Sequence, residues 1–435
     1  MRLISKLKFL SGNNYTKKDT IRGNSLYLVI FISFIVSVLL MLLITDNYYS
    51  QVEVLHYSSL QKLVDHTNSS VYAALAALPD EINTIPTDTI DQEIQSNSTK
   101  EQWGAFYLIS GSSGWKDLKY QKTALAGQYL FANGKTGLYL SDKGKYLSIA
   151  GETKLTGNCY IPALGLRSVY IDGKPYKGTQ LIYGKEKTSS RNLPELSPKL
   201  LEWLSKIFDG DVVLTDSLGN ISDFNRKDSI IQNFSTKALS YEHDGIFEMK
   251  DIILKGKIII HSDSTIILRK TCVTDNIIII APKIIIEKDF EGSLQAFARD
   301  SLLVEEGVRL NYPSFLSVYN NRATNAFCYI SENAGIAGGI LCGSYKAEDN
   351  NALLTISTGA EIDGIVYCNG SVTLSGKILG TLYVNRFVLK TPRGYYENHL
   401  LDAVIDPESQ YKNFIAPAVI ADYKNFGLAE WLVNE

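Results

Sequence analysis

The chain has few of the residues on which metal-dependent enzymes and nucleic-acid-binding proteins rely. Its 435 residues include five cysteines and five histidines. The cysteines include no C-x-x-C pair and the histidines no H-E-x-x-H motif, so no metal site is expected. No P-loop, G-x-G-x-x-G or G-x-S-x-G motif occurs, so we expect no cofactor and no catalytic residue of those classes. The net charge of −3 makes nucleic acid an unlikely partner.

The cysteines are odd in number and widely spaced, which argues against a dense disulfide framework but leaves one or two bridges open. Cys272 and Cys368 lie among β-branched residues. We expect both to act as small core hydrophobes.

Glycine and proline are absent from residues 24–78, and charge is absent from residues 24–45. The apolar stretch 26–45 is long enough, at about 1.5 Å per residue, to cross a hydrocarbon core of about 30 Å. Arg22 and Asp46 flank it. We therefore expect a transmembrane helix that associates with the membrane through residues 24–45. A cleaved secretory signal is the alternative, but the stretch exceeds the usual apolar region and no A-x-A-like site follows it.

Basic residues dominate the segment 1–23, where Asp19 is the only acid. By the positive-inside bias this segment is cytoplasmic and the bulk of the chain lies outside the cytoplasm. We therefore expect a single-pass membrane protein. The basic residues are Arg2, Lys6, Lys8, Lys17, Lys18 and Arg22.

Beyond Asp46 the sequence becomes amphipathic without a helix breaker. Apolar residues return at helical intervals among polar ones, which predicts a stalk or assembly helix continuing to residue 79. The apolar positions are Leu55, Leu60, Leu63, Val64, Val71, Leu75 and Leu78.

This N-terminal region resembles that of minor type IV pilins and pseudopilins, in which a basic leader ending in Gly precedes an uncharged helix. The matching residues are Ile21-Arg22-Gly23 and the helix opening at Asn24. The resemblance implies processing between Gly23 and Asn24. A plain signal anchor with a stalk is the alternative. The chain departs from the family in having Leu28 where those proteins carry Glu, and Asn24 in place of Phe or Met.

Residues 100–210 predict a middle antiparallel β domain. Short aromatic and β-branched runs alternate with turn signals such as Asn133-Gly134 and Asp172-Gly173. Ser197 as N-cap and Pro198 at the first helical position predict a short amphipathic helix over 197–208.

Residues 245–390 predict a C-terminal parallel β-helix, a solenoid, because isoleucine-rich runs follow one another every eight to ten residues with no helical pattern between them. A β-sandwich fits less well, since strict in/out alternation is missing. Apolar residues then recur six positions apart with glycines in phase, which predicts coils of about 18 residues. The apolar series is Leu354, Ala360, Val366, Val372, Ile378 and Val384. We expect residues 391–435 to cap the open end.

The segment 359–384 is similar to bactofilins, bacterial polymer-forming β-helix proteins, and this resemblance implies architecture only. The whole chain also resembles uncharacterised membrane-anchored proteins of Bacteroidetes-type bacteria, through segments 157–165 and 281–298. That resemblance implies a bacterial cell-envelope protein and no particular chemistry. Together with the expected topology, it implies a location in the bacterial inner membrane, with the bulk of the chain periplasmic or surface-exposed.

Tyrosines crowd the first β region, and their apolar faces and polar tips suit contacts with sugars or proteins. We expect a binding surface that includes Tyr129, Tyr139, Tyr146, Tyr160, Tyr170 and Tyr176. Packing within the β core is the alternative role for these tyrosines.

Carboxylates near predicted turns could instead serve a polysaccharide lyase or hydrolase, but charges at turns are expected anyway. They are Asp263, Asp275, Asp289, Glu291, Asp300, Glu305 and Glu306. The sequence therefore favours a non-catalytic structural or assembly component of the envelope, in a pilus-like or secretion-like apparatus or as an adhesin. Its expected partners are envelope proteins or further copies of itself, with polysaccharide as a candidate ligand.

Overall fold

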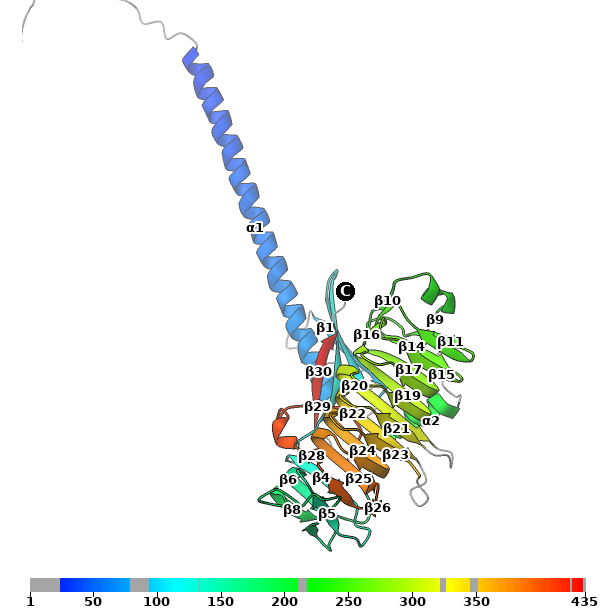
Figure 1. The fold of residues 1–435 in the computed structure, drawn as a ribbon. Coiled ribbons are helices and arrows are strands. Elements are labelled where there is room, and N and C mark those ends of the chain that lie inside the picture. The colour runs from blue at the N-terminus through cyan, green and yellow to red at the C-terminus, as the bar shows by residue number, and fades with distance from the viewer. Residues whose placement is uncertain are drawn as a thin grey trace, which may run out of the picture. The chain divides into compact units, whose positions relative to one another are not determined.

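The computed structural model describes residues 24–78, 94–132, 134–209, 217–320, 326–344, 351–422 and 425–432. The described chain is mainly β, with a long N-terminal helix (Figure 1). It divides into two compact units, Met1–Lys62 and Leu63–Glu435. Gly23 lies outside the described residues, and Asn24 is the first residue of the helix.

Helix α1 (Asn24–Ala76) runs unbroken for 53 residues, as the absence of glycine and proline predicts. Its apolar first part is exposed, with Phe34 at 65% and Leu43 at 65%. The Ser37 and Thr45 hydroxyls donate to the carbonyls of Ser33 and Met41, so these polar groups are satisfied within the helix. By length and composition the helix can cross a membrane, with a mean hydropathy of 3.0 over its most apolar 18 residues.

The last turns of α1 belong to the second unit and are buried there. Val71 and Ala74 are fully buried and share a hydrophobic cluster with Ile109 and Ala124. Gly111 of β2 (Phe106–Trp115) permits this approach, because a Cβ at that position would lie 2.7 Å from Val71 Cγ2. The expected stalk is therefore in part a packed element of the β unit.

An antiparallel sheet receives this end of the helix. It contains β1 (Gln95–Trp103), β2 and β3 (Leu118–Tyr129), and β3 also pairs with β29 (Ile415–Ala416) and β30 (Phe426–Leu432). The C-terminal tail thus returns to pair with strands from the start of the unit.

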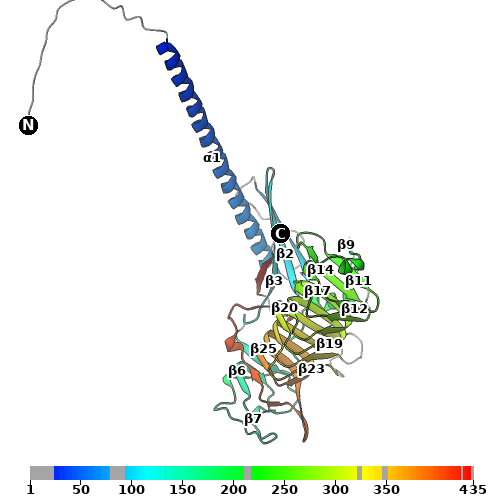
Figure 2. The same cartoon turned by 45° about the horizontal axis from the view of Figure 1, so that its top comes forward.

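A row of parallel strands, here called the parallel stack, occupies most of the unit (Figures 1 and 2). Each strand pairs in parallel with one whose matching residue lies 15 to 26 positions further along the chain. The strands are β14 (Ile258–Ser262), β17 (Ile277–Ile286), β19 (Leu294–Val304), β20 (Arg309–Asn320), β22 (Gly335–Ser344), β24 (Glu361–Leu374) and β25 (Lys377–Thr391).

In-register apolar side chains fill the interior of the parallel stack. One fully buried row contains Ile260, Ile279, Ala296, Leu316, Ile340, Val366 and Leu382. A second row of parallel pairs includes β12 (Ile246–Met249), β15 (Thr265–Leu268), β21 (Phe327–Ile330) and β23 (Leu353–Ile356). A third begins with β10 (Ser229–Gln232), β13 (Ile253–Gly256) and β16 (Val273–Asp275).

The six-residue register predicted from Leu354 to Val384 is confirmed, because all six positions are fully buried. Gly364 keeps the same phase and has φ +135°, a conformation that L side chains rarely adopt.

The expected antiparallel domain at 100–210 is correct for β1–β3 but wrong for the strands that follow. β4 (Thr136–Leu140), β6 (Lys154–Ile161) and β8 (Tyr183–Thr188) continue the parallel stack beyond β25, through the register Leu382, Leu138, Cys159 and Glu186. Asp172-Gly173 does make a tight turn, but it joins only the isolated antiparallel bridge between Ile171 and Lys174.

The remaining short elements lie around these strands. β5 (Leu147–Ala150) pairs in parallel with β7 (Leu166–Ser168) and β27 (His399–Leu401). β26 (Gly394–Glu397) folds back antiparallel on β25, and β28 (Val404–Ile405) lies between β25 and β6. Beyond β25, the stack is therefore continued by residues 136–188 as well as by part of the tail. We expected that tail, residues 391–435, to cap the open end of the stack. One hydrophobic cluster includes Leu138, Ile260, Val366 and Ile405, so the core is continuous through these segments.

Helix α2 (Pro198–Asp209) begins at Pro198, as predicted. Its residues Leu200, Leu204 and Ile207 are buried in a second cluster, together with outward-facing residues of the parallel stack such as Phe297. Trp203 packs edge-on against Phe297, with ring centroids 4.4 Å apart. The helix therefore covers part of one outer face of the stack.

Candidate functional site: a tyrosine- and asparagine-lined groove

Four tyrosines lie in a row on consecutive strands of the parallel stack. Tyr367, Tyr383, Tyr139 and Tyr160 are register partners on β24, β25, β4 and β6. Their successive ring centroids are 6.0, 6.0 and 5.2 Å apart. Because parallel in-register strands place equivalent side chains over one another, the pairing itself produces this ladder.

The ladder changes from buried to accessible along its length. Tyr367 and Tyr383 are 5% and 3% exposed, whereas Tyr139 and Tyr160 are half-buried. Lys187 of β8 lies 5.0 Å from the centre of the Tyr160 ring and donates to its hydroxyl at 3.1 Å. The accessible end of the ladder thus combines aromatic faces with a cation.

Two asparagines lie beside this ladder, each two residues after a tyrosine. The Asn369 amide donates to the Ser344 carbonyl at 2.7 Å and accepts from the Ser344 N–H at 3.1 Å. The Asn385 amide donates to the Asn369 carbonyl, and the Ser141 hydroxyl donates to Asn385 Oδ1 at 2.8 Å. These bonds hold the amides in place along the edge of the stack.

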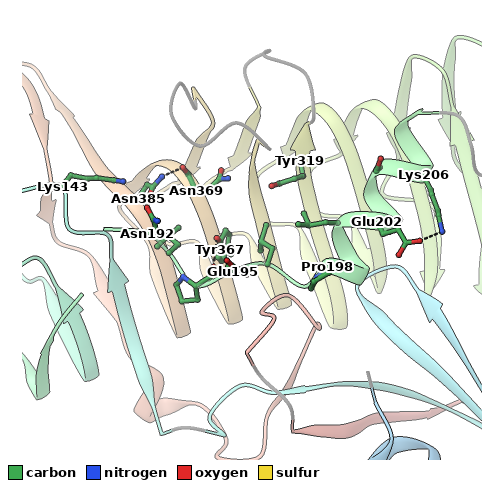
Figure 3. Close-up of a pocket in the computed structure, with 15 residues that line it drawn as sticks. Lys143, Asn192, Glu195, Pro198, Glu202, Lys206, Tyr319, Tyr367, Asn369 and Asn385 are labelled. Carbon is green, nitrogen blue, oxygen red and sulfur yellow. Dashed lines mark hydrogen bonds and ion pairs between the residues drawn. The ribbon is translucent and has the colours of Figure 1, made fainter. Parts of the chain in front are cut away.

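A groove with a cavity volume of about 730 Å³ runs between these side chains and α2 (Figure 3). Tyr319 and Tyr367 point into it from the stack, and the segment 192–196 forms another part of its lining. The Tyr367 hydroxyl donates to the Pro194 carbonyl at 3.0 Å. Burial is the main cause that raises the pKa of Tyr367, so this hydroxyl stays protonated.

The rim of the groove carries charges of both signs. Lys206 and Glu202 of α2 form an ion pair at 2.6 Å, and the Lys143 ammonium donates to the Arg191 carbonyl at 2.9 Å. Apolar faces, amides and mixed charges suit a polar, largely neutral partner such as a saccharide or a protein loop. This composition does not suit a polyanion.

The structure brings together only two of the six tyrosines proposed from the sequence, Tyr139 and Tyr160. Tyr146 carries the Arg167 guanidinium 4.9 Å from its ring centre, and Tyr170 is 68% exposed. The Tyr176 hydroxyl donates to the Gln180 carbonyl, and Tyr129 is half-buried in β3. The role of these tyrosines in binding stays a prediction.

Sequence reasoning missed Tyr319, Tyr367, Asn369 and Asn385 as groove residues. A signal was present, because Tyr367-Cys368-Asn369 recurs 16 residues later as Tyr383-Val384-Asn385. A spacing close to one coil places such repeats side by side in a parallel stack.

A second, smaller hollow of about 410 Å³ lies elsewhere on the stack, lined in part by Arg309, Glu361 and Asp363. Gly335 separates Arg309 from Glu361 in the register and leaves open space, because an added Cβ there would meet no atom within 4 Å. Burial, followed by the charge of Glu361, raises the pKa of Asp363. Neither carboxylate was among those considered from the sequence.

Several of the carboxylates considered from the sequence have polar partners. Glu306 pairs with Lys288 at 2.8 Å, and Glu305 accepts the Lys288 N–H at 2.9 Å. Within the described ranges, no group of three or more His, Cys, Asp or Glu side chains is placed to hold a metal ion.

No family model matches the chain, and no curated protein matches it. The crystal structure of the competence-associated pilin ComZ from Thermus thermophilus aligns over 82% of this chain and 86% of that chain, with 8% identity and a TM-score of 0.21. At that TM-score the likeness does not establish a shared fold. The resemblances to bactofilins and to Bacteroidetes-type envelope proteins stay predictions.

Proposed function

We propose that the protein is a single-pass, N-in membrane protein of the bacterial envelope that presents a rigid β-helix outside the cytoplasm as a non-catalytic assembly or adhesive component. The observation that carries this proposal is the division of α1. Its first part is apolar and exposed, and its last turns are packed in the β unit through Val71 and Ala74. One uninterrupted helix is therefore both the candidate anchor and a structural element of the unit that it anchors.

The β-helix assignment rests on three sets of parallel strand pairs. In each set, paired residues are separated by a number of positions close to the roughly 18 residues expected for one coil. A stack of short parallel strands with a continuous apolar interior resists bending, which suits a protein that holds a binding surface away from a membrane. The groove beside Tyr367 and Asn369 is the surface we assign to a partner, either a saccharide or another envelope protein.

Membrane extraction tests the anchor. Replacing both Ile35 and Val36 by Arg places two charges near the middle of the apolar stretch, at a cost of about 2.5–3.5 kcal/mol each on insertion scales. We expect the wild-type chain to remain in the membrane pellet after alkaline carbonate treatment and the double variant to be released. The control is Leu55→Arg, outside the apolar stretch at a residue that is 67% exposed, which should stay in the pellet. Release of the wild-type chain would contradict the anchor.

A polysaccharide-active enzyme is the competing proposal, and the hollow beside Glu361 and Asp363 favours it. A carboxyl group with a raised pKa next to a second carboxylate is the arrangement that glycoside hydrolysis uses. If envelope polysaccharides are cleaved by the wild-type chain and not by Glu361→Gln or Asp363→Asn, the non-catalytic proposal fails.

A further inference from the structure

Two of the five cysteines face each other across neighbouring strands. Cys342 on β22 and Cys368 on β24 are direct register partners in parallel strands, and both are fully buried in the same core cluster. Side chains at matching positions of parallel strands project to the same side of the sheet. The two thiols therefore lie next to each other in the interior of the parallel stack.

The spacing of these strands meets the requirement for a disulfide. Neighbouring strands lie about 4.7–4.9 Å apart, and disulfide-bonded residues have Cα–Cα distances of about 4.4–6.8 Å. The Cys342 thiol is hydrogen-bonded to Cys368, and this bond together with burial raises the pKa of Cys342. Both thiols are free in this structure.

The other three cysteines have different register partners. Cys159 lies between Leu138 and Glu186, and Cys328 lies opposite Leu354. Cys272 follows β15 and precedes β16. Strand register therefore singles out Cys342 and Cys368 as a pair. Burial does not, because all five thiols are buried.

We propose that Cys342 and Cys368 form a disulfide when the chain folds in the presence of a disulfide-bonded oxidant, such as oxidised glutathione or an oxidising thiol–disulfide protein. One thiolate attacks a sulfur of the oxidant to give a mixed disulfide and release one thiol. The second thiolate then displaces the other half of the oxidant. Two cysteine thiols are oxidised, the oxidant is reduced to two thiols, and the two cysteine protons end on the released thiols.

Burial of the two thiols determines when the disulfide can form. A fully buried thiol with a raised pKa is unreactive, so the exchange takes place before β24 closes over β22. Once formed, the bond is shielded from reductants by the same packing. It covalently joins two successive turns of the stack whose linked residues are 26 positions apart in the sequence.

Refolding of the full-length chain in detergent tests the pairing. The reduced chain is unfolded in denaturant and refolded in a mixture of oxidised and reduced glutathione. It is then alkylated in denaturant, and its peptides are mapped. We expect the free-thiol count to fall from five to three, with a peptide containing Cys342 joined to one containing Cys368. Five free thiols, or a bridge to Cys328, would overturn the proposal.

Variants give a matched comparison. Cys342→Ala and Cys368→Ala should each retain four free thiols, whereas the control Cys159→Ala should form the bridge and retain two. If the alanine variants do not refold, the wild-type peptide map still decides the pairing. A bridge that forms on refolding but is absent from chains alkylated in intact cells would count against the proposed location outside the cytoplasm and leave the pairing intact.

Discussion

A methyl group added at Gly364 should disrupt the parallel stack at a defined point. Gly338, Gly364 and Gly380 are register partners on three successive strands. A Cβ at Gly364 would lie 2.0 Å from the Gly338 carbonyl oxygen, and the residue has φ +135°. The contact is with backbone, so no side-chain rotation can relieve it.

The expected cost combines two terms. Backbone strain at such a conformation costs about 1–3 kcal/mol, and overpacking costs about 1–3 kcal/mol. Gly364→Ala should therefore lower the free energy of unfolding by about 2–6 kcal/mol, a large part of the roughly 5–15 kcal/mol typical of a domain. The control is Gly335→Ala on β22, where an added Cβ meets nothing within 4 Å and the expected change is within about 0.5 kcal/mol.

Urea unfolding of the full chain in detergent, followed by tryptophan fluorescence and circular dichroism, measures both variants. The Gly364 variant should unfold at a clearly lower urea concentration and the Gly335 variant at the wild-type concentration. Equal midpoints for the two variants would refute the register that places these glycines against one another.

The remaining predictions concern a buried carboxylate, the end of α1 and the N-terminus. Burial opposes ionisation of Asp406, but hydrogen bonds from the Thr156 hydroxyl at 2.6 Å and the Lys154 ammonium at 3.0 Å outweigh it and lower the pKa of Asp406 to about 2. The stabilisation by ionised Asp406 is present above the unfolded pKa near 3.9 and is lost as the pH falls towards 2. In urea titrations, Asp406→Asn should therefore show a smaller decrease in the free energy of unfolding between about pH 4 and 2 than the wild type. Val71→Asp buries an unpaired carboxylate at a fully buried site and should destabilise the β unit by about 3 kcal/mol or more in the same titrations. Intact mass and N-terminal sequencing of the mature protein should give a start at Asn24 if the pilin-like processing operates, and a start at Met1 or Arg2 if the N-terminus is a plain signal anchor.

For two of these predictions, a result equal to that of the wild type would contradict the structure. If Asp406→Asn follows the wild-type acid profile, the hydrogen bonds to Thr156 and Lys154 are absent in solution. If Val71→Asp unfolds like the wild type, the last turns of α1 do not pack in the β unit.

Local sequence patterns predicted the elements that depend on local physics. Helix α1 follows from an unbroken run without glycine or proline, and α2 begins at Pro198 as its capping residues require. The burial of Leu354 and the other positions of the six-residue series follows from periodicity, because successive strands of the parallel stack repeat the same inward positions.

The order of strands could not be predicted in the same way. Leu138 pairs with Leu382, 244 positions away, and no periodicity within residues 136–161 indicates that partner. The short aromatic runs of β4 and β6 are typical of antiparallel hairpins, and long-range pairing determined their direction instead. The groove was missed for the same reason, because β20, β24, β25 and residues 192–196 meet only in three dimensions.

Protease accessibility of the β unit tests its proposed location outside the cytoplasm. The full chain, with an epitope tag after Glu435, is expressed in cells whose outer layer is then removed while the inner membrane stays intact. We expect added protease to remove the tag while a cytoplasmic marker survives, and the remaining N-terminal fragment to stay in the membrane pellet. A tag that is protected until the inner membrane is lysed would place the β unit in the cytoplasm and contradict the proposed topology.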